Sequence, residues 1–163
     1  LLAAAVKDTV YIDKGLTSYA RCYKVSAVDY QEIEGPLSDS VCNDNCPYYE
    51  LPNVFTPNED GYNDSFNANF DHLLSGEVPI NGPIRCPRFV RQIDLRIYNR
   101  WGKEVYHYQS GEAELIAIDW NGKDMHDNEL DAGVYYYSAE VTFDVMDPSQ
   151  QVKEIKGWVH LIR

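Results

Sequence analysis

The sequence lacks any long apolar run, and no stretch approaches the roughly 20 apolar residues of a membrane-spanning helix. We therefore expect a chain that does not itself span a membrane. Basic residues are also few, with 14 Lys and Arg against 26 Asp and Glu and a formal net charge of −12. Because binding to phosphates needs a basic surface, nucleic acid is not an expected partner.

Recognisable catalytic motifs are absent as well. There is no Gly-rich phosphate-binding loop and no nucleophile elbow around a serine. Paired acids such as Glu112 and Glu114 fall where a solvated loop is expected, which does not favour glycosidase chemistry. The histidines lack the spacing of metal ligands: His72, His107, His126 and His160. We expect a protein that is not an enzyme and needs no cofactor.

The few basic residues are unevenly placed. Six of them fall between Arg85 and Lys103, where Asp94 is the only acid. Such a stripe can be a docking surface, or it can be a solvated strand face whose charges balance nearby carboxylates. The aromatic residues are mostly Tyr, 13 against five Phe, which predicts many half-buried rings with a hydroxyl at the surface.

Cysteine is sparse, and the four residues fit no metal-ligand spacing: Cys22, Cys42, Cys46 and Cys86. An even number in a β-rich chain points to disulfides and an oxidising compartment. Residues 20–28 and 37–42 are predicted as two strands around a turn. A hairpin centred near Ile33 sets Cys22 opposite Cys42, within reach of a disulfide. We predict a Cys22–Cys42 bridge, which leaves Cys46 to pair with Cys86.

The periodicity along the chain is that of strands, and no helix is expected. In 92–98, Ile93, Leu95 and Ile97 alternate with more polar side chains, as in a strand buried on one face. A turn at 147–150 joins the last two strands. A simple four-residue turn would set Phe143 opposite Glu154, an apolar side chain opposite a charged one, so we expect a bulge or a longer loop. The strand candidates are 9–12, 20–28, 37–42, 54–55, 66–70, 92–98, 103–108, 133–145 and 152–162.

Five motifs in the second part of the chain carry a family resemblance. In order they are 51–64 (LPNVFTPNEDGYND), 97–102 (IYNRWG), 120–123 (WNGK), 130–137 (LDAGVYYY) and 156–163 (KGWVHLIR). On these motifs the chain is similar to the gliding-motility-associated C-terminal domain, the type B sorting domain of type IX secretion cargo in Bacteroidota. One departure is Glu59, where that family usually has Gly. The resemblance implies an all-β fold, an immunoglobulin-like antiparallel β-sandwich over residues 47–163.

Residues 1–46 resemble the C-terminal part of a fibronectin type III domain. The run 22–29 is similar to the penultimate strand of such a domain, and 37–42 to its last strand. Only about half of the usual hundred or so residues is present, so we expect this part to pack on the next domain or to be completed by a missing piece. Because the sequence begins at Leu1 rather than Met, we expect a fragment or a processed form.

The resemblance implies a non-catalytic sorting and docking domain. Such a domain directs a secreted cargo protein through the outer-membrane translocon of the type IX system. It then stays associated with an outer-membrane protein of the PorP/SprF kind, so the expected location is the cell surface, outer-membrane associated. An alternative is a carbohydrate- or surface-binding module of a secreted adhesin, whose exposed Tyr and Trp stack on sugars. A third is an accessory domain of an enzyme.

The loop around Gly61 offers oxygen-bearing side chains at close spacing, as Ca²⁺ requires. Its pattern falls short of a full Asp-x-Asx-x-Asx-Gly loop with a distal Glu. The alternative is an Asx-rich turn whose side chains bond local backbone N–H groups. The four candidate calcium ligands are Asn58, Asp60, Asn63 and Asp64.

We expect partner recognition on the last strand. An edge strand can be extended by a strand of the partner, with Val159 and Leu161 packed inward; alternatively, this strand only completes the sandwich. Trp101, at a turn between two strands, can anchor a partner or can cover its own core. The candidate partner-binding residues are Arg100, Trp101, Lys156, Trp158, His160, Ile162 and Arg163.

Overall fold

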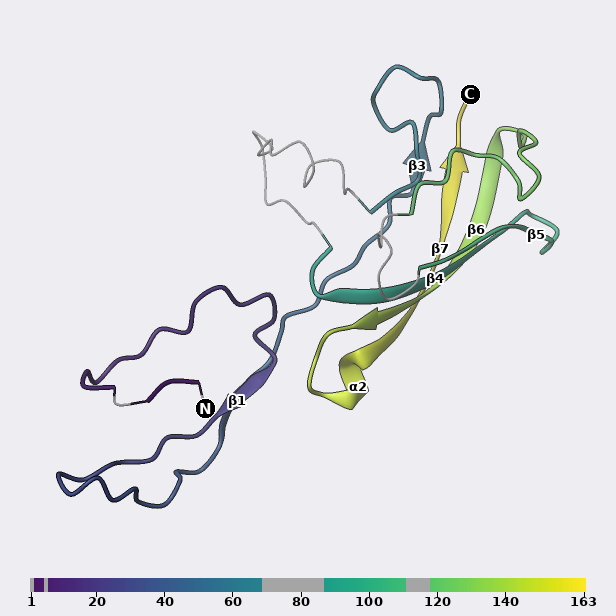
Figure 1. Ribbon diagram of the computed structural model, residues 1–163. Helices are drawn as coiled ribbons and strands as arrows, with labels where there is room; N and C mark the ends of the chain where they lie inside the picture. The colour runs from purple at the N-terminus through teal and green to yellow at the C-terminus, as the bar shows by residue number, and fades with distance from the viewer. Residues whose placement is uncertain (1, 5, 69–86, 111–117) are drawn as a thin grey trace. The chain divides into compact units, whose positions relative to one another are not determined.

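The computed structural model describes residues 2–4, 6–68, 87–110 and 118–163 (Figure 1). Apart from one helical turn, all regular structure in these residues is β, which confirms the expected fold class. The chain divides into two compact units, Leu1–Asn45 and Cys46–Arg163, which we call unit 1 and unit 2. In the described residues, no helix is long and apolar enough to cross a membrane.

Unit 1 contains one short hairpin closed by a disulfide. Strands β1 (Arg21–Tyr23) and β2 (Val41–Asn43) pair antiparallel, with Cys22 directly opposite Cys42. Their sulfur atoms are bonded, which confirms the predicted Cys22–Cys42 disulfide. The strands are shorter than predicted and residues 9–12 form none, because only Asn45 is buried among the described residues of unit 1. Without a core, alternating apolar residues have nothing to pack against.

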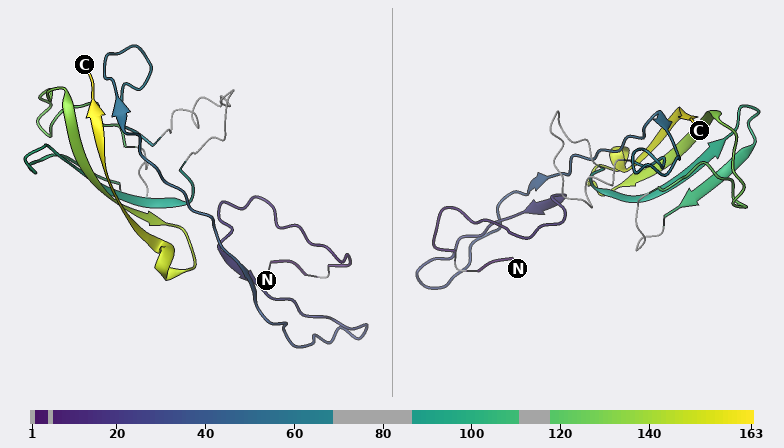
Figure 2. Two further views of the ribbon diagram at one scale, coloured as in Figure 1. Left: turned by 180° about the vertical axis from the view of Figure 1, so that it is seen from behind. Right: turned by 90° about the horizontal axis from the view of Figure 1, so that it is seen from above.

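Unit 2 is built on a five-stranded sheet of order β3-β7-β6-β4-β5 (Figures 1 and 2). Neighbouring strands are antiparallel except β3 and β7, which are parallel. Their bounds agree with the predicted strands to within about two residues, as expected for element boundaries. They are β3 (Val54–Phe55), β4 (Val90–Tyr98), β5 (Glu104–Gln109), β6 (Gly133–Phe143) and β7 (Val152–Leu161).

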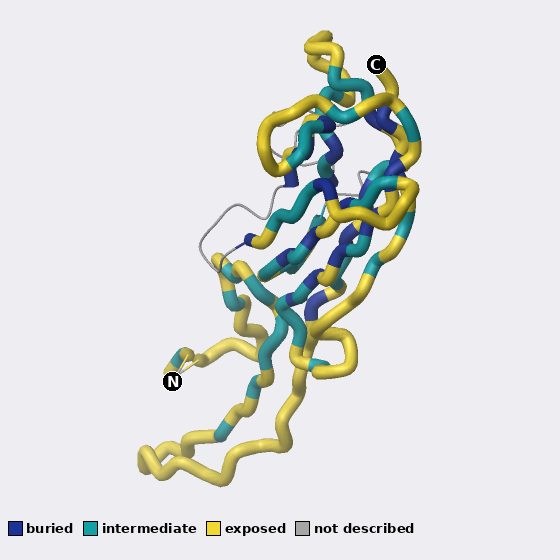
Figure 3. Tube along the Cα trace, turned by 90° about the vertical axis from the view of Figure 1, so that its right-hand side faces the viewer, coloured by how far each residue is buried: buried dark blue, intermediate teal, exposed yellow. Residues whose placement is uncertain are grey.

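Along the strands of the sheet, buried residues alternate with exposed or half-buried ones (Figure 3). One face of the sheet is therefore buried and the other is open. Ile93, Leu95 and Ile97 are fully buried, as their alternation predicts. The buried face packs against a second layer of mostly irregular chain, which makes unit 2 a sandwich with one regular sheet. This layer supplies Tyr49, Leu51, Phe66, Ala68, Ile118 and Trp120 to the core. Of the predicted strand 66–70, Phe66 forms an isolated bridge with Trp120, and 69–70 lie outside the described residues.

The expectation of no helix is wrong at one place. Helix α2 (Pro148–Gln151) replaces the predicted turn at 147–150. Asp147 caps it by accepting a hydrogen bond from the Ser149 N–H, and Pro148 occupies the first turn, where a missing N–H does no harm. With α2 between them, β6 and β7 first pair at Thr142 and Val152. The connection is therefore longer than a four-residue turn, as predicted.

The expectation that the last strand is an edge strand is only partly right. Strand β3 pairs with the C-terminal end of β7, with Val54 opposite His160 and Phe55 opposite Leu161. The N–H groups of His160 and Ile162 donate to Asn53 O and Phe55 O. Sequence alternation could not reveal this pairing, because it joins segments about a hundred residues apart. His160 and Leu161 are thus paired with a strand on each side.

The second predicted disulfide is not formed at Cys46, which is exposed and carries a free thiol. Its predicted partner, Cys86, lies outside the described residues. The pairing was inferred by elimination, and elimination does not bring two sulfur atoms within bonding distance.

Candidate partner-docking surface

The open face of the sheet carries three aromatic side chains side by side. Tyr98 is paired with Tyr136 across β4 and β6, and Tyr136 with Trp158 across β6 and β7. Directly opposed residues of adjacent strands point to the same face, so the three rings form a row, which we call the aromatic row. Tyr136 and Trp158 are 51% and 49% exposed. Rings that keep half their surface in water are available to a partner.

On one side, the aromatic row is bordered by further apolar surface. Val134 and Val54 lie opposite His160 from the two neighbouring strands. Both valines are about 40% exposed, at 40% and 42%, and His160 is exposed. Two of the predicted partner-binding residues, Trp158 and His160, therefore belong to one continuous apolar and aromatic area.

On the other side lies a row of charged side chains, including Lys156. The Lys156 ammonium is 2.7 Å from the Glu154 carboxylate, and Arg96 Nε is 3.3 Å from Asp94. The hydrogen bond from Lys156 lowers the pKa of Glu154, and the hydrogen bond to Asp94 raises the pKa of Arg96. This border pairs acidic with basic side chains, so it can orient a partner without presenting excess charge of one sign.

The β4–β5 hairpin displays another Trp. The Asn99 side-chain oxygen accepts hydrogen bonds from the N–H groups of Trp101 and Lys103, both at 3.0 Å. Gly102 has a φ of 78°, which glycine adopts without strain. Trp101 is 75% exposed, and the Arg100 guanidinium lies 4.1 Å from the centre of its ring. The alternative that Trp101 covers the core is therefore wrong, because the indole stacks on Arg100 in solvent.

The last two predicted residues are engaged within unit 2. Arg163 donates to Leu130 O and to Gly122 O, both at 3.2 Å, and pairs with Glu129 at 3.2 Å. The Ile162 N–H is bonded to β3, and its side chain is 42% exposed. These contacts fix the end of the chain, so a partner-binding role for Ile162 and Arg163 stays a prediction.

Part of the basic stripe is balanced by neighbouring carboxylates. Arg91 pairs with Asp144, and Arg96 is also 3.8 Å from Glu104. Arg88 lies 5.8 Å from the centre of the Tyr48 ring. Arg85 lies outside the described residues. These contacts favour the alternative in which the stripe compensates local carboxylates and is not a separate docking surface.

The candidate calcium loop is organised by hydrogen bonds to its own backbone. The Asp64 carboxylate accepts from the N–H groups of Asn58, Glu59 and Gly61 at 3.1, 2.7 and 2.7 Å. Asp60 accepts from the Tyr62 N–H at 2.8 Å and from the Asn58 side chain at 2.9 Å. This is the geometry of the Asx-rich alternative. Calcium binding by these oxygens and Asn63 stays a prediction, and the ion would compete with these donors.

The backbone conformation at Glu59 explains why glycine would be favoured at this position of the loop. Its φ is 62°, in the left-handed region that costs about 1–2 kcal/mol for a residue with a side chain. Glycine loses about 0.5–1 kcal/mol more conformational entropy on folding. We therefore expect Glu59→Gly to stabilise unit 2 by about 0.5–1 kcal/mol, measured as the midpoint of urea unfolding. Glu140→Gly, within strand β6, is the matched control and should destabilise; equal shifts for both variants would contradict this explanation.

Two residues of the aromatic row, Tyr98 and Tyr136, were missed by the sequence analysis. The signal was present in part, because both alternate with buried neighbours along their strands. What was missing is the register, which sets Tyr136 between Tyr98 and Trp158.

An all-β unit with a buried face and an open aromatic face defines a β-sandwich domain as the class of protein. The CHU_C type IX secretion signal domain family matches residues 49–161, and the chain belongs to this family. Its role is therefore sorting in the type IX secretion system, as part of a secreted, cell-surface protein.

No curated protein matches the chain. Among solved structures, the chain is similar to PorZ of Porphyromonas gingivalis, described as an essential bacterial surface component of the type-IX secretion system. The identity is 17% and the TM-score 0.37, over 71% of this chain and 11% of PorZ. The chain thus corresponds to a small part of that protein's length.

Proposed function

We propose that unit 2 docks its cargo on an outer-membrane protein of the type IX secretion machinery, of the PorP/SprF kind. The observation that carries the proposal is the aromatic row on the open face of a domain from a secretion signal family. A sorting domain must be recognised by another protein, and half-exposed Tyr and Trp are the residues that most often dominate such interfaces. Trp101, stacked on Arg100, extends the candidate surface at the hairpin.

The proposal also includes the origin of unit 1 and the absence of catalysis. Unit 1 is the end of a fibronectin-like repeat of the cargo, and unit 2 from about residue 47 is the sorting domain. Three of the predicted residues, Lys156, Trp158 and His160, take part in docking through side chains on the open face. The domain performs no chemistry; its contribution is binding and orientation.

The test uses the 163-residue chain and a purified PorP/SprF-like outer-membrane protein in detergent. We expect Trp158→Ser combined with Tyr136→Ser to weaken binding by at least about 30-fold, since truncating even one hot-spot residue costs about 2 kcal/mol or more. Surface plasmon resonance gives the affinity. The matched control is Tyr30→Ser, which removes a 92% exposed ring in unit 1 and should leave binding unchanged.

A carbohydrate-binding module is the second candidate, because a row of half-exposed rings also suits stacking on sugars. A glycan array distinguishes the two. Binding to glycans that is lost in the double variant, with no binding to the outer-membrane protein, would replace the proposed function by this alternative.

A further inference from the structure

Part of the outer edge of β7 is open. Strand β3 covers only the end of β7, where the His160 N–H donates to Asn53 O. Main-chain groups of alternate residues point to the same side of a strand. The N–H and C=O groups of Glu154 and Lys156 therefore point outward on the same side as those of His160, and no backbone group in the described chain bonds to them.

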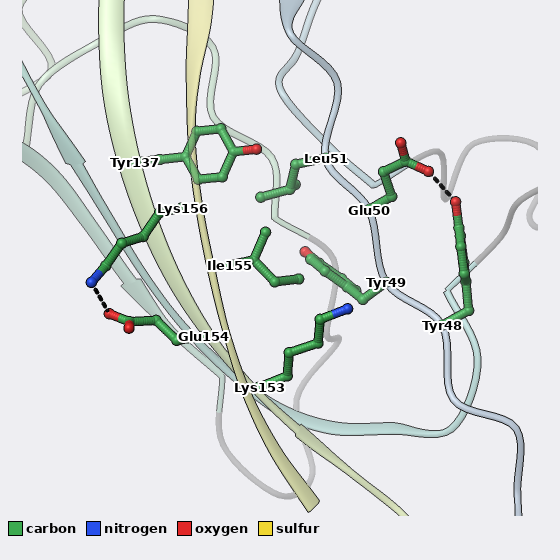
Figure 4. A pocket seen from close by; sticks show the side chains of 9 residues that line it. All are labelled: Tyr48, Tyr49, Glu50, Leu51, Tyr137, Lys153, Glu154, Ile155 and Lys156. Atoms are coloured by element: carbon green, nitrogen blue, oxygen red, sulfur yellow. Dashed lines mark hydrogen bonds and ion pairs between the residues drawn. The ribbon is translucent and has the colours of Figure 1, made fainter. Parts of the chain in front are cut away.

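A pocket of about 510 Å³ lies along this open stretch (Figure 4). One wall is residues 153–156 of β7, the other is residues 48–51, and Tyr137 of β6 completes the lining. Leu51 and Ile155 give it apolar surface. All of these residues belong to unit 2. We call the open edge together with this pocket the edge groove.

The pocket contains a buried polar group that the fold leaves unsatisfied. Tyr49 is only 5% exposed, and its hydroxyl has no hydrogen-bond partner in the described chain. Burial raises the pKa of Tyr49, so the hydroxyl keeps its proton and remains a donor. Buried hydroxyls are normally paired, so an orphan of this kind calls for an explanation.

A cation lies at the same pocket. Lys153 lines it, and within the described residues no carboxylate lies within ion-pair distance of its ammonium. The other charged residues of the lining are engaged: Glu50 accepts from the Tyr48 hydroxyl, and Glu154 pairs with Lys156. The pocket thus offers two donors, the Tyr49 hydroxyl and the Lys153 ammonium, beside apolar surface.

We propose that the edge groove binds an extended segment of a partner protein as an added β-strand, with an Asp or Glu side chain of that segment in the pocket. The main-chain groups of Glu154 and Lys156 would pair with the added strand, as in other cases of strand addition. The carboxylate would accept hydrogen bonds from the Tyr49 hydroxyl and the Lys153 ammonium, and its negative charge would complement the positive charge of Lys153. The inference rests on the proposed function only in assigning this segment to the type IX machinery.

The test uses the full chain and a defined probe, the capped peptide Thr-Thr-Val-Glu-Val-Thr-Thr, compared with the same peptide carrying Gln for Glu. We expect the Glu peptide to bind, with the backbone amide signals of Glu154 and Lys156 shifting in ¹⁵N NMR spectra. Tyr49→Phe and Lys153→Gln should each weaken binding about tenfold and abolish the preference for Glu over Gln. Lys103→Gln, on the β4–β5 hairpin, is the charge-matched control and should bind as the parent does.

A backbone variant tests the strand pairing itself. Lys156→Pro removes an outward N–H that β6 does not use, and proline is tolerated on an open edge. It should abolish peptide binding, whereas Lys156→Gln should keep it. If the Glu peptide does not bind at a concentration of about 1 mM, the inference is overturned. The inference is also overturned if the chain dimerises in a concentration-dependent way and Lys156→Pro abolishes the dimer. A second copy of the chain would then occupy the open edge of β7.

Binding to the purified outer-membrane protein separates this inference from the proposed function. If Tyr136→Ser with Trp158→Ser abolishes that binding while Tyr49→Phe with Lys153→Gln leaves it intact, the aromatic row docks the machinery and the edge groove does not. If neither set of variants changes it, the docking surface proposed on unit 2 is wrong.

Discussion

Replacing Trp120 by alanine is expected to destabilise unit 2 by about 3–5 kcal/mol, the usual cost of removing a large buried aromatic. Trp120 is fully buried, and its ring centre is 5.1 Å from that of Phe55 and 5.7 Å from that of Tyr135. Its indole N–H donates to Lys123 O at 2.8 Å, so alanine also leaves that carbonyl without its donor. Because domains of this size are stable by only about 5–15 kcal/mol, a large part of the stability is lost.

Urea unfolding of the 163-residue chain, followed by near-ultraviolet circular dichroism, measures this effect. Trp101→Ala is the matched control, since that indole is 75% exposed, and it should change the stability by less than about 0.5 kcal/mol. Trp120→Phe retains part of the ring and should fall between the two. Similar losses for Trp101→Ala and Trp120→Ala would show that Trp120 is not the centre of the core.

Reduction of the Cys22–Cys42 disulfide is expected to unfold unit 1 and to leave unit 2 folded. The bridge spans 20 residues, and a loop of that size is worth about 3 kcal/mol in the chain-entropy estimate. Unit 1 has almost no buried side chains in its described residues to replace that contribution. Small units without a core depend on such cross-links.

Hydrogen exchange with and without reductant locates the effect. Amides of 21–23 and 41–43 should lose protection on reduction, while those of β4 in unit 2 should keep it. Cys22→Ser combined with Cys42→Ser should reproduce the result without reductant, and Cys46→Ser, which removes a free thiol, should not. Retained protection in the reduced hairpin would mean that the strands hold each other without the bridge.

The strands of unit 2 were predictable because one face of each is buried. Alternation in 92–98 sets Ile93, Leu95 and Ile97 on the core side, and the structure buries all three. In unit 1 the same reasoning overestimated the strands, because residues 9–12 have the composition of a strand but no core to face. Strand propensity describes fit to a half-buried surface, and it fails where that surface is missing.

The candidate site was only partly predictable. Trp158 and His160 were expected to be displayed, and the structure exposes both. Tyr98 and Tyr136 were not expected, since their neighbourhood follows from register across three strands. The orphan hydroxyl of Tyr49 could not be foreseen either, because it depends on how residues 48–51 pack beside β7.

The sequence by itself determined the all-β class, the strands of unit 2, the inward faces of β4 and of the end of β7, and the Cys22–Cys42 pairing, because these follow from local alternation and from one short hairpin. The tertiary structure alone decided that β3 covers the end of β7, that Cys46 is unpaired, and which side chains gather at the aromatic row and the edge groove. Local periodicity fixes the direction of a side chain, whereas its neighbours across the sheet depend on contacts between segments far apart in the chain.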